Sequence, residues 1–266
     1  MAATLAASLV AQPPQRPENT GWTIATGGGI AVAPAWQGSD DYQVLALPSI
    51  RVTYGDTFFA SVEGGMGYRL FRQDGWTAGP LLAMDFGRDN DGSSPFALGG
   101  SDSDALRGFA DIDTTIAAGA FVTYETGAWS TRLDLLQALG GHEGLTGKLS
   151  LDYKLPIGGS RAERVPPFLV STGPRLTWGD GTYQNTFFGV SAADSAGSGL
   201  PTYRASAGVS TLGWGANIAR PLNQRWYLLG LLSYERLIGD AADSPLITRR
   251  GSPNQFFAGL FASYQF

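Results

Sequence analysis

Apolar and polar residues alternate along this chain from Trp22 almost to its last residue, Phe266. The clearest stretch is 145–155, where odd positions hold Leu, Gly or Tyr and even positions hold Thr, Lys, Ser or Asp. Successive side chains of a β-strand point to opposite faces, so such a segment has one apolar and one polar face. This period of two predicts a chain built from amphipathic strands.

Twelve segments follow the rule, and most have the roughly ten residues that a tilted strand needs to cross a bilayer. Segment 183–191 has an ambiguous phase, and the phase changes between Val209 and Leu212 in a way that predicts a β-bulge. The segments are 22–33, 43–54, 57–70, 76–86, 112–125, 129–139, 145–155, 167–178, 183–191, 203–219, 225–237 and 255–266.

The composition excludes several protein classes. Charged residues make up only 15% of the chain, whereas soluble proteins have roughly 25%. No apolar stretch approaches the roughly 18 residues of a transmembrane helix. The absence of Cys excludes disulfides, thiolate metal sites and Cys nucleophiles. A net charge of −5 argues against nucleic-acid binding, which needs a basic surface.

Aromatic residues at the ends of the apolar faces favour a membrane barrel over a water-soluble β-sandwich, because amphipathic rings prefer the membrane interface. We therefore predict an all-β fold, an antiparallel transmembrane β-barrel of about twelve strands of the outer-membrane type. These aromatic residues are Trp22, Tyr54, Tyr68, Trp76, Phe86, Tyr124, Trp129, Tyr153, Phe168, Trp178, Trp226 and Tyr234.

Charged residues in the middle of the polar faces would line the lumen of such a barrel. Both signs are present, and twelve strands leave a narrow interior, so we expect salt bridges that largely fill it. The predicted lumen-lining residues are Arg51, Glu63, Arg132, Asp134, Lys148, Asp152 and Arg175.

The two ends of the chain predict export to the outer membrane. Residues 1–11 are small and apolar, like the end of a signal peptide, and 12–21 form a polar segment before a single barrel domain, 22–266. The last segment is amphipathic and places Tyr264 and the terminal Phe266 on its apolar face. This ending looks like the signal read by the barrel assembly machinery, which we expect as a partner.

An even number of strands puts both termini on the periplasmic side. Counting from there, the long connections 157–167, 191–202 and 238–254 face outward, and 55–56, 179–182 and 221–224 are tight periplasmic turns. The connection 87–111 breaks this rule, since it is long but falls on the periplasmic side. It is a periplasmic binding loop, or it folds into the lumen as a constriction, or the strand count is wrong at this point.

Few residues point to chemistry. His142 falls in a predicted periplasmic turn beside Glu143, with no Ser placed to be activated, so a turn residue is favoured over a catalytic base. Residues 89–92 lack the ligand spacing of a calcium loop. We predict no catalytic residue, metal site or cofactor. Acidic residues of the outer loops keep them soluble or hold cations among lipopolysaccharide phosphates: Asp40, Asp41, Asp240 and Asp243.

Several stretches together resemble the MipA/OmpV family of outer-membrane proteins, in the family's order. They are VAPAWQGSDDYQVLALPSIRVTYGDTFFAS, TAGPLLAMDFGRD, ALRGFADIDTTIAAGAF, STGPRLTWGDGTYQNTFFGV and LIGDAADSPLITRRGSPNQFFAGLFASYQF. The resemblance implies an outer-membrane location and a non-enzymatic scaffold that links a lytic murein transglycosylase to a bifunctional murein synthase. Outer-membrane lipid and lipopolysaccharide are the other expected partners.

The connection 87–111 is the expected periplasmic contact of such a scaffold, because one short segment mixes charge with apolar groups that we expect to be exposed. Its candidate partner-binding residues are Asp104, Leu106, Arg107 and Phe109. Two other functions stay open at this point. One is a narrow channel for small solutes, and the other is a lipid-modifying enzyme that uses His142.

Overall fold

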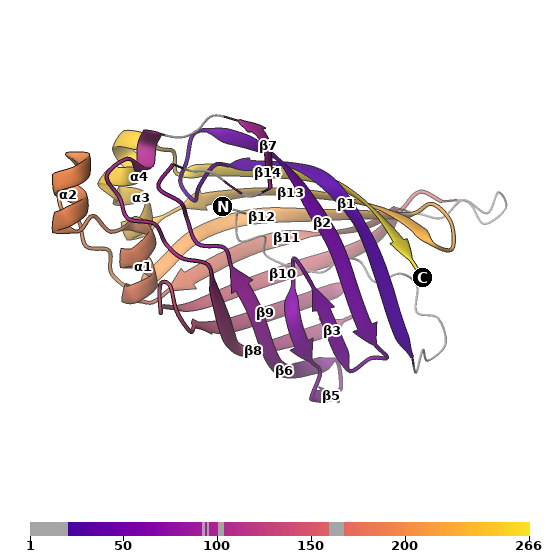
Figure 1. Cartoon of the computed structure of the whole chain (residues 1–266). Coiled ribbons are helices and arrows are strands. Elements are labelled where there is room, and N and C mark those ends of the chain that lie inside the picture. Colours follow the sequence, from indigo (N-terminus) through magenta and orange to yellow (C-terminus); the bar gives the residue numbers. More distant parts are fainter. Residues whose placement is uncertain (1–20, 92–93, 95, 101–103, 160–167) are drawn as a thin grey trace.

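The computed structural model describes residues 21–91, 94, 96–100, 104–159 and 168–266. Within them, fourteen strands form one antiparallel sheet, and all but β5 (Phe71–Gln73) and β7 (Ala97–Gly100) form a closed ring (Figure 1). The ring strands are β1 (Trp22–Pro34), β2 (Tyr42–Tyr54), β3 (Phe58–Ser61), β4 (Gly65–Tyr68), β6 (Trp76–Asp85), β8 (Thr115–Thr126), β9 (Trp129–Ala138), β10 (Leu145–Ile157), β11 (Phe168–Gly179), β12 (Gly208–Pro221), β13 (Trp226–Leu237) and β14 (Asn254–Gln265).

The first strand closes the barrel. On one side β1 pairs with β14, from Ala25 opposite Gln265 to Val32 opposite Ala258. On its other side it pairs with β2 along its whole length. The predicted antiparallel barrel of about twelve strands is therefore confirmed.

The outer wall of the barrel is apolar and carries aromatic residues at both rims. Large exposed side chains alternate with buried or polar ones along each long strand, as in Leu149, Leu151 and Tyr153 of β10. At one rim, a Trp that begins a strand packs on a Tyr from the neighbouring strand in four places. These pairs are Trp22–Tyr54, Trp76–Tyr124, Trp129–Tyr153 and Trp226–Tyr264. Their positions match the aromatic girdles of outer-membrane barrels.

Two of the predicted strands are wrong, although the total is right. The segment 57–70 is a hairpin of β3 and β4, joined by a turn over 62–64. The Ser61 hydroxyl accepts a hydrogen bond from Gly64 N at 2.8 Å, and Gly65 has a φ of 70°. Three turn residues leave the odd–even phase unchanged, so the alternation passes through the turn unbroken.

The segment 183–191 is mostly the helix α1 (Gly181–Phe188) instead of a strand. The Asp180 carboxylate accepts from Tyr183 N and caps the helix start. Its buried residues Tyr183, Gln184, Phe187 and Phe188 recur at a spacing of four, which is the helical period.

The predicted bulge in β12 is confirmed. Thr177 of β11 lies opposite Thr211, while the next residue, Trp178, lies opposite Val209, so the register shifts at this point. Ser210 is the extra residue, and its hydroxyl donates to Thr177 O at 3.2 Å.

The two ends of the barrel differ in their connections. The turn end holds the start of β1, the end of β14 and the tight connections 55–57, 74–75, 127–128 and 222–225. The cap end holds the connections 35–41, 86–114, 139–144, 180–207 and 238–253. It carries the helices η1 (Asp104–Leu106), α1, α2 (Ala192–Ser198), α3 (Gly239–Asp243) and α4 (Pro245–Arg250) (Figure 1). None of the helices in the described part of the chain is long and apolar enough to cross a membrane.

This arrangement corrects several predicted positions. The connection 87–111 and His142 lie at the cap end, away from the termini. The residues 179–182 also lie at the cap end and begin α1, whereas the connection after β10 lies at the turn end. The predicted long outward connections 191–202 and 238–254 do lie at the cap end. The predicted signal peptide, 1–11, is outside the described residues.

The outward face predicts how the barrel responds to a charge. Leu149 lies midway along β10, whereas Leu139 follows the cap-end edge of β9. We expect Leu149→Lys to lower the free energy of unfolding in lipid vesicles by about 2–4 kcal/mol and Leu139→Lys by about 0–1 kcal/mol. Urea unfolding followed by Trp fluorescence measures both. Equal losses would contradict a lipid-facing wall.

Candidate functional site

The cap-end connections meet in one apolar core. Four connections that leave the barrel at different points of its rim contribute to it, so they must converge across the mouth. We call this set of connections the cap. Its buried core residues are Ala35, Trp36, Leu106, Phe109, Ile112, Tyr183, Phe187, Phe188, Val190, Leu200, Ala205, Leu237, Ala241, Leu246 and Ile247.

Buried polar contacts fasten the connections of the cap to one another. Arg88, at the foot of the connection 86–114, donates from Nη1 to Phe187 O of α1 at 3.0 Å. Burial lowers the pKa of Arg88 to about 10, which leaves the guanidinium charged at neutral pH. The Ser244 hydroxyl donates to Phe188 O at 2.6 Å. Both bonds join segments far apart in the sequence.

The segment around η1 packs tightly against α2 and α4. Gly108 has a φ of 91°, and a Cβ atom there would lie 2.4 Å from Gly197 C at the end of α2. Only glycine fits this close approach. From α4, Arg250 donates to Ala105 O at 3.0 Å, to Arg107 O and to Ser198 O. The segment is therefore an integral part of the cap.

Of the four predicted partner-binding residues, two are buried in the cap and two are exposed on its surface. Leu106 and Phe109 are 0% and 6% exposed and belong to the cap core, so the expectation that they are exposed apolar contacts is wrong. Asp104 and Arg107 form an exposed ion pair of 2.6 Å at the surface of the cap. A partner contact at these two residues stays a prediction.

His142 is a structural residue of the cap end. Its ring is 4% exposed and packs edge-on against Tyr183 and Phe187, with both ring centroids at 5.4 Å. Nδ1 accepts from Gly144 N at 3.0 Å, so the ring proton of the neutral form is on Nε2, which lies 3.6 Å from Asp85 Oδ2. Neither nitrogen has a free lone pair for a general base.

Tyr183 connects this cluster to the opposite side of the mouth. Its hydroxyl donates to Gln37 Oε1 at 3.2 Å, in the connection between β1 and β2. Burial raises the pKa of Tyr183, so the phenol stays protonated and able to donate. The ring of Tyr183 thus packs on His142 while its hydroxyl holds the far connection.

Charges of both signs line the inner wall below the cap, on β9, β10, β11 and β13. Lys148 lies opposite Asp134, and Ser150 separates Arg132 from Arg175 on the two flanking strands. The Arg132–Asp134 ion pair measures 2.8 Å between Nε and Oδ1. We call these residues the inner charge belt: Arg132, Asp134, Lys148, Asp152, Arg175 and Glu235.

The most deeply buried pair of the belt joins Arg175 and Asp152. Nη2 of Arg175 lies 2.7 Å from Asp152 Oδ1, and the two side chains are 7% and 0% exposed. The Ser171 hydroxyl also donates to the same carboxylate oxygen at 3.2 Å. Glu235 of β13 interacts electrostatically with both Lys148 and Arg175. The belt carries three positive and three negative side chains.

Five of the seven predicted lumen residues therefore lie together in the belt. Arg51 on β2 and Glu63 form a second group on the opposite wall, where they interact electrostatically with each other. Glu63 lies in the turn between β3 and β4 and not in mid-strand. The sequence reasoning missed Glu235, although its odd position between the outward Tyr234 and Arg236 marks it as inward.

No cluster of His, Asp or Glu in the described residues has the arrangement of a metal site. The cap end therefore consists of connections that share one apolar core, and two ion pairs, Arg132–Asp134 and Arg175–Asp152, lie in the inner charge belt below it.

Comparison with known proteins confirms the resemblance to the MipA/OmpV family that the sequence shows. The model of the family described as MltA-interacting protein MipA matches residues 26–266. No curated protein matches the chain.

Among solved structures, the chain is similar to OprB of Pseudomonas putida, with 12% identity, a TM-score of 0.37 and coverage of 84% of this chain and 59% of that one. It is similar to an anion-selective porin from Comamonas acidovorans at 11% identity and a TM-score of 0.30, over 92% and 98% of the two chains. It is similar to OmpT of Vibrio cholerae at 8% identity and a TM-score of 0.35, over 92% of this chain and 96% of that one. At these TM-scores the likeness is too distant to say anything about function.

The buried pair of the belt gives a stability prediction. Asp152→Asn keeps the shape of the side chain but leaves Arg175 without its counter-charge, so we expect a loss of about 3–5 kcal/mol in the free energy of unfolding. Arg72→Gln breaks the exposed pair with Asp56 and should cost about 0–1 kcal/mol. Urea unfolding in lipid vesicles compares the two variants. A loss in Asp152→Asn no larger than in Arg72→Gln would mean that the pair is hydrated.

The cap predicts a closed barrel. We expect the purified full chain to give no conductance steps in a planar bilayer, because the apolar core covers the mouth. Leu246 is fully buried in this core, and Leu246→Ala should weaken the core by about 2–5 kcal/mol and so produce brief openings. Leu260→Ala, on the lipid-facing wall, is the matched control. Steady conductance of the wild type would overturn the prediction.

Proposed function

Since this chain belongs to the family of the MltA-interacting protein MipA, we propose that it is a non-enzymatic scaffold that docks a lytic murein transglycosylase of the MltA kind. The chain is an outer-membrane β-barrel, with an apolar wall facing lipid. A murein synthase, implied by the sequence resemblance, is the second partner of this proposal. Both enzymes act on murein, so the scaffold must present its docking surface to the periplasm.

The covered mouth is the observation that most supports a scaffold over a channel. Connections from around the rim share one apolar core across the mouth, and the inner charge belt beneath them is neutralised by its own ion pairs. A channel needs a continuous polar path, which an apolar core of this size interrupts. The narrow-channel alternative is therefore not favoured.

The geometry of His142 supports a non-enzymatic role. A nucleophilic mechanism needs a base with a free lone pair beside the nucleophile. In this cluster Nδ1 accepts a backbone N–H, and Nε2 faces Asp85. The aromatic rings of Tyr183 and Phe187 also cover the imidazole and keep substrate away from it.

The docking surface of this proposal is the turn end. Outer-membrane barrels have short periplasmic turns and long extracellular connections, and the turn end is the one with the short turns and both strand termini. Two exposed ion pairs stand there, Arg72–Asp56 at 3.0 Å and Lys154–Glu125 at 2.5 Å. Arg72, Glu125 and Lys154 stand on strands, and Asp56 stands in the tight connection 55–57. A partner that binds these charges therefore pays little conformational entropy to order them.

Three charge-reversal substitutions test which end docks the enzyme. Arg72→Glu and Lys154→Glu reverse exposed charges at the turn end, and Arg107→Glu reverses the matched exposed charge of the cap. We expect the first two to weaken capture of a purified MltA-type transglycosylase by nanodiscs by about fivefold or more, because attraction becomes repulsion. Arg107→Glu should leave capture unchanged.

The other outcomes are equally informative. A loss confined to Arg107→Glu would move the docking surface to Asp104 and Arg107 on the cap. Failure of the wild-type nanodiscs to capture the enzyme at all would refute the scaffold role.

A further inference from the structure

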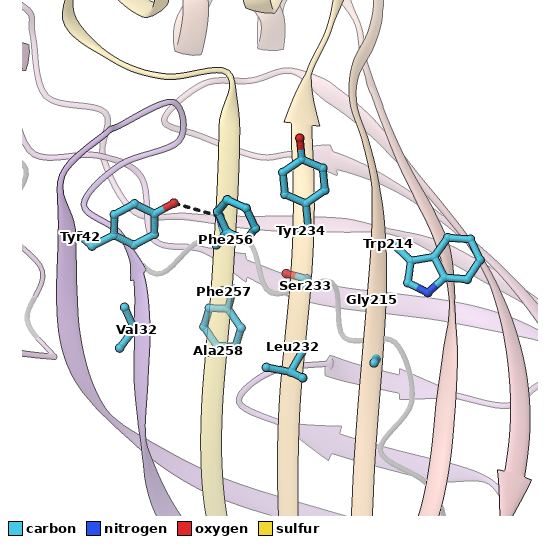
Figure 2. A pocket seen from close by; sticks show the side chains of 11 residues that line it. Val32, Tyr42, Trp214, Gly215, Leu232, Ser233, Tyr234, Phe256, Phe257 and Ala258 are labelled. Carbon is cyan, nitrogen blue, oxygen red and sulfur yellow. Dashed lines mark hydrogen bonds between the residues drawn. The ribbon is translucent and has the colours of Figure 1, made fainter.

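A groove of about 370 Å³ crosses the outer wall of the barrel near the cap end. It runs over β12, β13, β14 and β1, and Figure 2 shows the strands side by side with the side chains that line it. Apolar side chains dominate the lining, including Trp214, Leu232 and Phe256. The groove therefore opens toward the lipid and not toward the lumen.

Cross-strand register explains how the groove forms. Ala258 of β14 lies directly opposite Leu232 of β13 on one side and Val32 of β1 on the other. One step toward the cap, Phe256 packs on Tyr234 with ring centroids 4.8 Å apart. A methyl group surrounded by larger side chains leaves a trough in an otherwise bulky apolar layer.

The cap-side edge of the groove is polar and positively charged. The Tyr234 hydroxyl and Arg236 Nη1 both donate to Asn254 Oδ1, at 2.8 and 2.6 Å. The Tyr42 hydroxyl reaches across β1 and accepts a hydrogen bond from Phe256 N at 3.1 Å (Figure 2). Among the described residues no carboxylate forms an ion pair with Arg236, so its charge is open to an anion from outside.

An apolar trough below a guanidinium is complementary to an anionic amphiphile. The trough is at the lower end of the range of about 300–1,000 Å³ typical of small-molecule sites, so it suits one flexible chain better than a protein surface. Arg236 is suited to a phosphate, which it can bind through two parallel N–H groups. Tyr and Trp side chains prefer the interface between lipid head groups and acyl chains. Tyr234 and Trp214 in the lining therefore place the cap-side edge of the groove at that interface.

We propose that this groove binds one acyl chain of lipid A, with a lipid A phosphate on Arg236. The cap end carries the long connections, which face outward in barrels of this kind, so the leaflet around the groove is the one that contains lipopolysaccharide. The site is separate from the docking surface at the turn end. Binding there would fix the barrel's rotation relative to its lipid neighbours without occupying the lumen.

Two variants and their matched controls test the site. Ala258→Leu fills the trough with another apolar side chain, and Arg236→Gln removes the charge. Ala120→Leu on the outward face of β8 and Arg220→Gln near the turn end repeat the same substitutions elsewhere on the barrel. The readout is native mass spectrometry of the full chain in detergent, titrated with hexa-acylated lipid A. Heat-shifted mobility in gels confirms that each variant is folded.

We expect Ala258→Leu and Arg236→Gln each to weaken lipid A binding by about five- to tenfold, the effect of a blocked trough or a lost charge-assisted hydrogen bond. The control variants should bind like the wild type. Equal binding by all five proteins would overturn the proposal, as would phosphatidylglycerol competing as well as lipid A does, since either result means ordinary boundary lipid. Loss of a dimer in Ala258→Leu would also overturn it, because a second copy would then occupy the groove.

Discussion

Every backbone N–H and C=O that meets the hydrocarbon must be paired within the chain, because water cannot reach it there. Closure of β1 onto β14 and β2 meets this demand for most of the wall. The short hairpin of β3 and β4 pairs only with the turn-end part of β2. The cap-end residues of β2 would have an unpaired edge if no other strand covered them. The strand β7 pairs there with Gln43–Leu45, and Ala46 N donates to Phe96 O at 2.8 Å. The longest cap connection thus also completes the wall.

The same constraint fixes the interior. Because one side of the wall faces lipid, its polar side chains must point inward, where opposite charges can pair with one another. The belt does this with pairs such as Arg175–Asp152. Above the belt, the apolar core of the cap interrupts the polar path that water would need through the mouth. A barrel whose lumen is paired and covered can still act through its two end surfaces, and this favours a scaffold over a channel.

The sequence predicted the wall well because lipid leaves little freedom in the choice of side chains there. It failed where three residues, 62–64, turn the chain without changing the odd–even phase. Missing that turn reversed the predicted side of each later connection, including 87–111 and the turn with His142. The false strand over 183–191 restored the parity, so 238–254 was placed correctly. The buried state of Leu106 and Phe109 was not predictable either, because it depends on partners from three other connections.

The two ends of the barrel are built for different kinds of contact. At the turn end, hairpins place charges such as Lys154 and Arg72 on rigid supports next to a ring of Trp–Tyr pairs. At the cap end, the apolar side chains of the connections pack against one another. The groups that these connections expose to solvent are mainly polar. A partner that docks on the turn end meets charges that are already in place, so recognition there depends on charge complementarity. The lipid-facing groove between the two ends meets only the membrane, which is why its chemistry, an apolar trough with one cation at the rim, matches an amphiphile and not a protein.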